Sequence, residues 1–406
     1  MDEDQFVLGV NYWPRREAVA FWRQFDAGEV RDDFALCADL GLSVVRLFLL
    51  WDDWQPRPDV VSRECLRSFE KVCDIAAGNG LGLDVTFFTG HMSGPNWPTR
   101  WLLDPQAPLS ERPAALGSEF VDSGYRNPYV DRVALSAETK LLQTVVGAFR
   151  QHPAIWMWNL GNEPDIFARP PDHLSGQQWV KRMTETIRAV DESHPVTCGL
   201  HIDSLVADNG LWINEVFGET DVAVMHAYPM YASWARRPLD PEFVPFTCAL
   251  TSALCGRPTL AEEWGGCTAP RGSESVTWEW DLCGKPHRQF MASEEALAEY
   301  VAQVLPGLQA VGSPGALLWC FADYDPSLYD RPFCNEWRHE RHFGLVRPDG
   351  SLKPHAAELR RFALSHPHAK PASRVVTLDV TPEAYYQKPL ENARRLYHEF
   401  LCEGDS

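Results

Sequence analysis

The sequence predicts an α/β fold, namely a (β/α)8 TIM barrel with long loops on the catalytic face and a short C-terminal extension. Eight short apolar segments alternate with about eight amphipathic helical segments along the 406 residues. The apolar segments do not alternate with polar residues, which is typical of parallel strands covered on both faces. The length suits one barrel with insertions. A doubly wound sheet is disfavoured, because no G-x-G-x-x-G sequence follows the first strand.

Each predicted strand is an apolar, β-branched run, and a segment of helical periodicity follows every strand except residues 195–201, which precede a looser stretch. The expected strands are residues 6–13, 43–50, 83–89, 154–160, 195–201, 221–227, 258–262 and 315–321. The expected helices are residues 29–40, 66–77, 136–150, 177–190, 241–253, 293–305 and 354–364. Gly41 is placed to end the first helix, and Pro306 is expected to stop the sixth.

The domain organisation expected from the sequence is one catalytic barrel over residues 1–368, because no linker, repeat or low-complexity tract interrupts it. Residues 369–406 hold a strand-like segment at 375–380 and a helical segment at 390–401. This extension is too short to fold alone, so we expect it to pack on the barrel.

Composition argues against several classes of protein. The chain has 37 basic and 56 acidic side chains and a net charge of −19, so nucleic acid is not an expected partner. Its apolar runs are all shorter than the roughly 18 residues of a membrane span, and no membrane partner is expected. The start, Met1-Asp-Glu-Asp-Gln5, resembles no signal peptide, and the 11 cysteines include no C-x-x-C pair, which together favour a cytoplasmic location. Without such pairs we expect no metal and no other cofactor.

Two glutamates stand where barrel enzymes place catalytic groups, after the C-terminal ends of strands. Glu163 follows the fourth predicted strand in Asn162-Glu163-Pro164, and Glu263 follows the seventh in Glu262-Glu263-Trp264-Gly265. These two strands face each other across such a barrel. Facing carboxylates can hydrolyse a glycosidic bond, one as proton donor and one at the anomeric carbon. Neighbours in a strand point to opposite faces, so only one of Glu262 and Glu263 is expected to face the cleft.

These motifs resemble the clan A glycoside hydrolases, most closely family 5, and the resemblance covers most of the barrel. It implies Glu163 as the acid/base and Glu263, in preference to Glu262, as the nucleophile. Further site residues follow from the same resemblance. They are Arg46, which would hold the nucleophile, His226 and Tyr228 of a His-x-Tyr motif whose tyrosine contacts the nucleophile, and Trp319, which would floor the subsite of the cleaved sugar. We expect Asn162 to donate to the sugar 2-hydroxyl.

Other residues near strand ends are weaker candidates for substrate binding. His91 follows the third strand and either bonds a sugar hydroxyl or has a structural role. Trp13 and Trp264 adjoin the first and seventh strands. His339 and His342 have helical metal-ligand spacing, but without further ligands we interpret them as packed or solvated side chains.

Tryptophan is abundant, and its placement suggests a binding surface on which sugar rings stack. Ten of the 16 tryptophans fall near strand ends or in long loops: Trp13, Trp51, Trp54, Trp97, Trp101, Trp158, Trp264, Trp278, Trp280 and Trp319.

The expected function follows from three long loops, at residues 90–131, 265–292 and 322–353. Loops of this length usually have a function, and three of them favour an enclosed pocket over an open groove. A pocket accepts the end of a chain. We therefore predict a retaining exo-β-glycosidase that acts on a small oligosaccharide or glycoside, with β-mannosides favoured over β-glucosides or β-galactosides. The alternatives are an endo-β-mannanase or endoglucanase and a non-catalytic carbohydrate-binding barrel; the sequence leaves the oligomeric state open.

Overall fold

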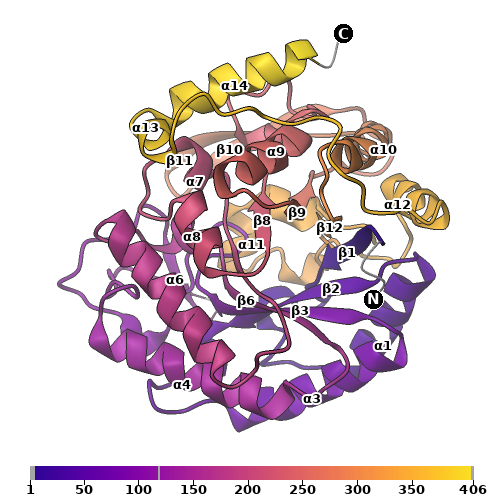
Figure 1. The fold of residues 1–406 in the computed structure, drawn as a ribbon. Helices are drawn as coiled ribbons and strands as arrows, with labels where there is room; N and C mark the ends of the chain where they lie inside the picture. Colours follow the sequence, from indigo (N-terminus) through magenta and orange to yellow (C-terminus); the bar gives the residue numbers. More distant parts are fainter. Residues whose placement is uncertain (1–4, 118, 404–406) are drawn as a thin grey trace.

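The computed structural model describes residues 5–117 and 119–403 and contains an eight-stranded parallel barrel (Figure 1). Neighbouring strands follow the order β7-β6-β3-β2-β1-β12-β9-β8. A parallel bridge between His201 and His226, next to β7 and β8, joins the two ends of this order. The predicted fold class is therefore confirmed.

Every barrel strand overlaps a predicted one. The strands are β1 (Val7–Asn11), β2 (Val44–Leu50), β3 (Gly82–Thr89), β6 (Ile155–Asn162), β7 (Val196–Gly199), β8 (Ala223–His226), β9 (Thr259–Gly265) and β12 (Gly315–Trp319). Their side chains are buried almost throughout, because helices cover the outer face of the sheet and side chains fill its interior.

Long helices surround the barrel (Figure 1). They are α1 (Ala27–Asp39), α3 (Arg63–Gly78), α4 (Arg132–Phe149), α6 (His173–Arg188), α8 (Ile213–Glu219), α9 (Phe243–Cys255), α10 (Glu294–Ala310) and α12 (Pro354–Leu364). The prediction that Pro306 stops its helix is wrong, since α10 continues to Ala310. Proline removes one helical hydrogen bond, but the apolar face on both sides of it, including Val304 and Leu308, is buried against the barrel.

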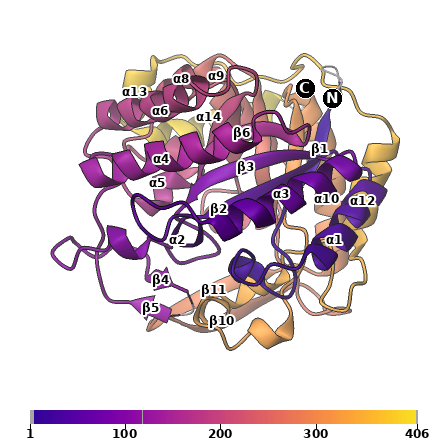
Figure 2. The ribbon, with the colours of Figure 1, turned by 90° about the horizontal axis from the view of Figure 1, so that it is seen from below.

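Shorter elements follow several strands. The short helices are α2 (Trp51–Trp54), α5 (Pro164–Phe167), α7 (Asp203–Val206) and α11 (Pro332–Glu336). Two hairpins lie within the predicted loops 90–131 and 265–292. They are formed by β4 (Ala114–Leu116) with β5 (Glu119–Val121) and by β10 (Val276–Leu282) with β11 (Lys285–Met291). They lie near each other on one side of the barrel (Figure 2).

The C-terminal extension contains α13 (Pro382–Tyr386) and α14 (Pro389–Glu403) and crosses the barrel close to α9 (Figure 1). The hydroxyl groups of Tyr385 and Tyr386 donate to the carbonyls of Leu205 and Ser204 beside α7. The strand expected at residues 375–380 is not formed, because the closed barrel offers no free edge for it.

The expectation of no signal peptide rests on the start of the sequence, and residues 1–4 lie outside the described residues. Residues 404–406 of the C-terminal extension also lie outside them. Within the described ranges, no helix combines the length and hydropathy needed to span a bilayer.

Candidate active site

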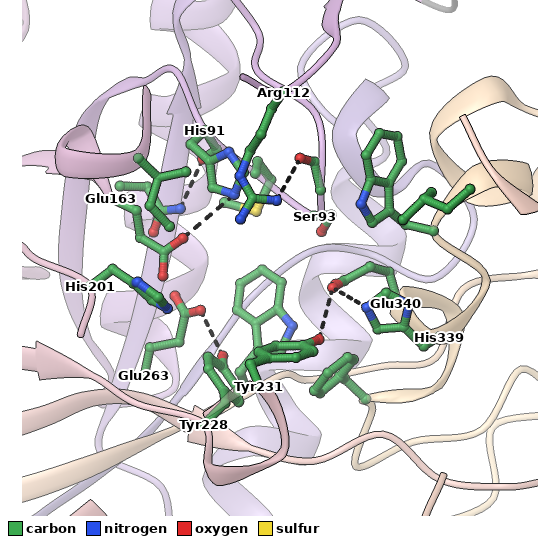
Figure 3. Close-up of a pocket in the computed structure, with 18 of the residues that line it drawn as sticks. His91, Ser93, Arg112, Glu163, His201, Tyr228, Tyr231, Glu263, His339 and Glu340 are labelled. Carbon is green, nitrogen blue, oxygen red and sulfur yellow. Dashed lines mark hydrogen bonds and ion pairs between the residues drawn. The ribbon is translucent and has the colours of Figure 1, made fainter. Parts of the chain in front are cut away.

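A cavity of about 250 Å3 lies where the barrel strands end (Figure 3). All three predicted long loops contribute to its wall. The strand ends and the residues that follow them supply Asn162, Glu163, His201, Tyr228, Glu263 and Trp319, and the loops supply His91, Ser93, Arg112, Leu282, His287, Trp337, His339 and Glu340. A second hollow of about 540 Å3 adjoins the cavity and shares Arg112, Leu282 and Trp337 with it.

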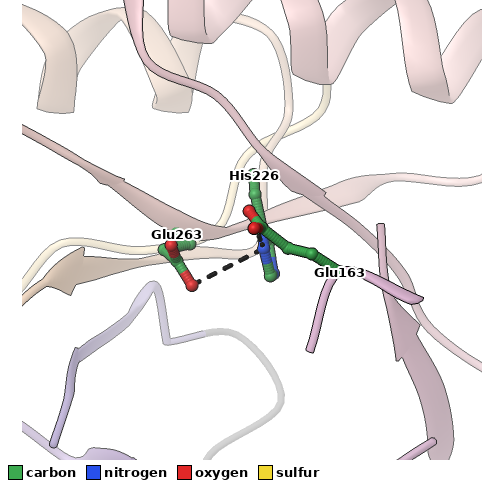
Figure 4. A group of neighbouring side chains, drawn as sticks. All are labelled: Glu163, His226 and Glu263. Atoms are coloured by element: carbon green, nitrogen blue, oxygen red, sulfur yellow. Dashed lines mark hydrogen bonds and ion pairs between the residues drawn. The ribbon is translucent and has the colours of Figure 1, made fainter. Parts of the chain in front are cut away.

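Glu163 and Glu263 face each other in the cavity, and both are almost fully buried. One oxygen of each carboxyl group and one nitrogen of His226 all lie within 4.8 Å of one another (Figure 4). Glu163 has a left-handed backbone, with φ of 47°, at the point where β6 ends and α5 begins. Such strain in a non-glycine residue is common where a side chain must be held in a particular direction.

Arg46 of β2 is completely buried and joins several groups of the site. Its Nη1 donates to Oε2 of Glu263 at 3.0 Å and to Oδ1 of Asn11 at 3.0 Å. Its Nη2 donates to Oδ1 of Asn162 at 3.0 Å, while Nδ2 of Asn162 donates to the carbonyl of His91 at 2.9 Å. The amide of Asn162 is therefore fixed on both sides, and Arg46 provides a counter-charge for Glu263.

Tyr228 follows β8 and donates from its hydroxyl to Oε1 of Glu263 at 2.6 Å. Burial raises the pKa of this tyrosine, and the adjacent charge of Glu263 raises it further. The hydroxyl thus stays protonated and serves as a donor to the carboxylate.

His226 lies beneath the cavity, with no exposed surface, at the end of β8. Its Nδ1 lies 3.2 Å from Oε1 of Glu163 and 3.5 Å from Oε2 of Glu263, and its Nε2 lies 2.8 Å from Oε2 of Glu262. Burial opposes a charge on the ring, but Glu263 and the hydrogen bonds to Glu163 and Glu262 raise the pKa of His226 to about 9. The ring is therefore an imidazolium near neutral pH.

A β-bulge explains how two consecutive glutamates both enter the barrel. From Ala261 to Trp264, β9 advances three residues while its neighbour β12 advances two. The register against β8 shifts at the same place. The extra residue breaks the usual alternation of side chains, so Glu262 points into the interior beneath Glu263, and only Glu263 lines the cavity.

The protonation of the facing pair reflects its charged neighbours. Burial favours a protonated Glu163, but the charges of His201 and His226 outweigh it and lower the pKa of Glu163 well below the ordinary range. Burial raises the pKa of Glu263, and the charge of Glu163 adds to this effect. Carboxylates this close cannot both ionise easily, so the pair favours one charge and one proton.

Two further histidines face the cavity in different charge states. Burial, with the nearby charge of Arg112, lowers the pKa of His91 to about 4, and its Nδ1 lies 2.8 Å from Oδ1 of Asn96. His91 is therefore neutral. Burial also opposes a charge on His201, but the carboxylates of Glu163 and Asp203 raise its pKa to about 9.

The tryptophan prediction needs correction. Among the ten tryptophans proposed as stacking surface, Trp319 alone lines the cavity, and Trp337, which was not predicted, joins it. Trp13 is buried and stacks on Phe48, with its Nε1 donating to the sulfur of Met92 at 3.2 Å. Trp264 is buried near Tyr300 of α10, because it follows Glu263 in the strand and points outward. Neither lines the cavity, so both belong to the core.

Several cavity residues were missed because they lie in loops or were given another interpretation. His339, interpreted as merely packed or solvated, lines the cavity, and its Nε2 lies 3.3 Å from Oε1 of Glu340. The hydroxyl of Tyr231 donates to the same oxygen at 3.5 Å. Arg112 and His201 also escaped notice, and only the length of the loop around Arg112 indicated that it had a role.

A metal ion has one candidate site among the described residues, formed by Glu163, His226 and Glu263. Glu263, however, already accepts hydrogen bonds from Arg46 and Tyr228. The Arg46 guanidinium would also repel a second cation. We therefore assign no metal to this group.

Comparison with known proteins supports the motifs and the fold. Residues 113–365, more than half of the chain, match the family model of the glycosyl hydrolases family 2 TIM barrel domain. Mannan endo-1,4-beta-mannosidase 4 of Oryza sativa subsp. japonica is 25% identical over 273 residues, covering 59% of this chain and 56% of that protein. The chain spans at most 56% of the length of the curated relatives it matches.

Solved structures share the fold. An exo-beta-1,4-mannosidase from Opitutaceae bacterium strain TAV5 superposes with a TM-score of 0.71 at 24% identity, over 89% of this chain and 59% of that chain. A GH5_18 variant from Streptomyces cattleya, solved in complex with Manβ1-4GlcNAc, superposes with a TM-score of 0.78 at 19% identity, over 97% of this chain and 92% of that chain. The chain belongs to the TIM-barrel family of the family 2 glycosyl hydrolases, and so to clan A, the clan that its sequence motifs resemble.

Proposed function

We propose that the protein is a retaining β-glycosidase with Glu263 as nucleophile and Glu163 as acid/base. The observation that carries the proposal is the approach of these two carboxyl groups, whose oxygens come within 4.8 Å of each other at the cavity wall. Retaining glycosidases hold their carboxyl groups about 5 Å apart, whereas inverting enzymes leave a wider gap for water.

In the first step Glu263 attacks the anomeric carbon while Glu163 gives its proton to the departing glycosidic oxygen. This step needs an ionised Glu263 and a protonated Glu163, so the proton that the charged neighbours favour on Glu263 must move to Glu163. Nδ1 of His226 contacts both carboxylates, at 3.2 and 3.5 Å, and so offers a short route for one proton between them. Arg46 and Tyr228 hold the oxygens of Glu263 for the attack. In the second step Glu163 removes a proton from water, which releases the sugar from Glu263.

We propose an exo mode of action from the shape of the site. The inner cavity of about 250 Å3 is slightly below the roughly 300–1,000 Å3 typical of ligand pockets. Its wall includes the β10–β11 hairpin, through Leu282 and His287. This size suits one terminal sugar, and the adjoining hollow beyond Arg112 and Trp337 leaves room for the leaving group.

A β-mannoside is the substrate we favour. The rice relative is a mannan endo-mannosidase, the structure from strain TAV5 is an exo-mannosidase, and the Streptomyces protein was solved with Manβ1-4GlcNAc. The endo mode of the rice protein is the second candidate, and the products formed from a longer chain distinguish the two.

The test begins with a panel of nitrophenyl β-glycosides, followed by Manβ1-4GlcNAc and mannohexaose. Release of mannose from chain ends supports the exo mode, and internal cleavage supports the endo mode. Proton NMR of the first product should show the β-anomer, since the α-anomer would mean inversion.

Two variants assign the roles of the glutamates. Glu263→Ala should lose nearly all hydrolysis and, with azide, form an α-glycosyl azide. Glu163→Ala should still cleave dinitrophenyl glycosides, because their leaving groups need no proton. With added azide this variant should form a β-glycosyl azide. Full activity in either variant with natural disaccharides would overturn the assignment.

A further inference from the structure

A second pair of carboxyl groups lies inside the barrel, below the cavity. It consists of Asp84 of β3 and Glu262 of β9, and neither has any exposed surface. Neither residue lines the cavity, so neither can touch a substrate there. A buried charge is costly unless it is paired and hydrogen-bonded. Two adjacent buried carboxyl groups therefore require a particular distribution of protons.

Glu262 has the surroundings of an ionised carboxylate. Its Oε2 lies 2.8 Å from Nε2 of His226 and 3.4 Å from Nη2 of Arg46, and its Oε1 accepts from Nδ2 of Asn159 at 3.0 Å. Donors from three strands thus converge on it, and two of them are cationic. The charge of Arg46 and the contact with His226 keep the pKa of Glu262 low despite its burial.

Asp84 has the surroundings of a neutral acid. Among the described residues, neither of its oxygens accepts a hydrogen bond from a donor group. The closest cation, Nε of Arg46, lies 3.8 Å away and already donates to Oγ1 of Thr86. The Asp84 side chain instead meets the Glu262 carboxyl group, and burial together with that neighbouring charge raises the pKa of Asp84 well above the ordinary value. Without a donor of its own and beside the ionised Glu262, the buried Asp84 carboxyl group favours its protonated form.

We propose that Glu262, with the protonated Asp84 as its partner, is a positioning residue that fixes His226 as an imidazolium directed at Glu163 and Glu263. With Arg46 and His226 positive, Glu262 negative and Asp84 neutral, the group carries one net positive charge. One ionised carboxylate of the facing pair balances it, and the other keeps its proton. A retaining glycosidase also starts with one ionised and one protonated carboxyl group, and here the proton must lie on Glu163 for the first step.

The groups that face His226 come from four strands. They are Arg46 of β2, Asp84 of β3, Glu163 after β6, and Glu262 and Glu263 of β9. Beyond the ring, His201 after β7 faces Glu163 and is balanced by Asp203. Cys198 of β7 stays a neutral thiol, because burial raises its pKa well above the ordinary value.

Two near-isosteric variants test the proposal through the pH profile of kcat/KM on nitrophenyl β-mannoside. Glu262→Gln removes the negative charge that pairs with Nε2 of His226, one of the three carboxylates that stabilise the imidazolium. Without this charge we expect His226 to become neutral, so that both carboxylates of the facing pair lose a cationic neighbour. The acidic limb and the basic limb of the profile should therefore both move to higher pH, by about one unit or more. Asp84→Asn keeps a neutral donor beside Glu262, so the limbs should stay in place.

The reverse result would overturn the proposal. If Asp84 carried the charge, Asp84→Asn would move the limbs and Glu262→Gln would leave them unchanged. Unmoved limbs in both variants would also contradict a positioning role for Glu262.

A second measurement needs no catalytic activity and no substitution of Glu262 or Asp84. In wild-type protein labelled with 15N-histidine, the ring of His226, assigned through His226→Phe, should have both nitrogens protonated at pH 8. A neutral ring there would overturn the proposal. The pH-profile consequence rests on the proposed function, but the NMR signal does not. A protein that shows the imidazolium yet hydrolyses no glycoside would contradict the proposed function and support the assignment of charge.

Discussion

Nδ1 of His226 lies 3.2 Å from Glu163 and 3.5 Å from Glu263, so one ring nitrogen contacts both proposed catalytic carboxylates. Replacement by asparagine, His226→Asn, removes the charge and the shared contact. We expect kcat on Manβ1-4GlcNAc to fall by about 100-fold, a typical loss when proton transfer is impaired. Steady-state kinetics measure the loss, with the exposed His398→Asn in α14 as the control. An equal loss in the control would point to general damage to the fold.

Tyr228 is expected to contribute through its hydroxyl alone. Tyr228→Phe removes the donor that lies 2.6 Å from Oε1 of Glu263 but keeps the ring. Hydrogen bonds to charged groups contribute about 1.5–3 kcal/mol, so kcat/KM should decrease by roughly 10- to 100-fold. The matched control is Tyr231→Phe, because that hydroxyl contacts Glu340 at 3.5 Å and neither catalytic carboxylate. Similar losses in both variants would count against a specific role for Tyr228.

Glu138 in α4 should make stability depend on pH independently of the active site. It is completely buried, and one of its oxygens accepts from Nε1 of Trp179 at 3.1 Å. Burial raises the pKa of Glu138 to about 8. An acid with a raised folded-state pKa binds more protons folded than unfolded, so its contribution is present below the unfolded-state value and is lost as pH rises towards 8.

Urea denaturation of the wild type and Glu138→Gln at several pH values tests this expectation. From pH 5 to pH 8 the free energy of unfolding of the wild type should decrease relative to the variant by about 3 kcal/mol. The exposed Glu295→Gln serves as control and should follow the wild type. Parallel curves for the wild type and Glu138→Gln would show that Glu138 does not titrate in this range.

The β10–β11 hairpin should decide whether long chains can enter. Residues 279–288 can be replaced by Asn-Gly, since Trp278 and Gln289 are directly paired and a two-residue turn can connect them. This change removes Leu282 and His287 from the cavity wall. We expect internal cleavage products from mannohexaose to appear, as seen by chromatography. The control is Cys283→Asn, which gives the intact hairpin the same Asn-Gly turn. Unchanged products from the shortened variant would show that the hairpin does not limit access.

Strand positions could be predicted well because a closed parallel barrel buries both faces of every strand. Continuous apolar runs such as residues 43–50 are therefore visible in the sequence itself. The cavity wall was less accessible, since it depends on how loops far apart in the chain meet. Arg112 and His339 lie more than 200 residues apart yet line one cavity, and neither has a local pattern that marks it.

For the tryptophans, sequence position did not predict which side chains line the cavity. Sequence position placed Trp13, Trp264 and Trp319 near strand ends alike, but only the direction of each side chain separates core from cavity. Trp264 points outward and Trp319 inward. If Glu263 points inward, the alternation of side chains along a strand places Trp264 on the outside. The bulge that also turns Glu262 inward has no signature in the sequence.

For protein engineering, the bulge at Glu262 and Glu263 means that the nucleophile cannot be transplanted as a single side chain. A straight strand carrying Glu263 alone would present the carboxylate without the interior glutamate that holds His226 from below. A designer who moves this site into another barrel must therefore copy the inserted residue and the backbone shift with it. Likewise, deletion of Glu262 would restore the regular strand and change which neighbouring side chains meet the substrate.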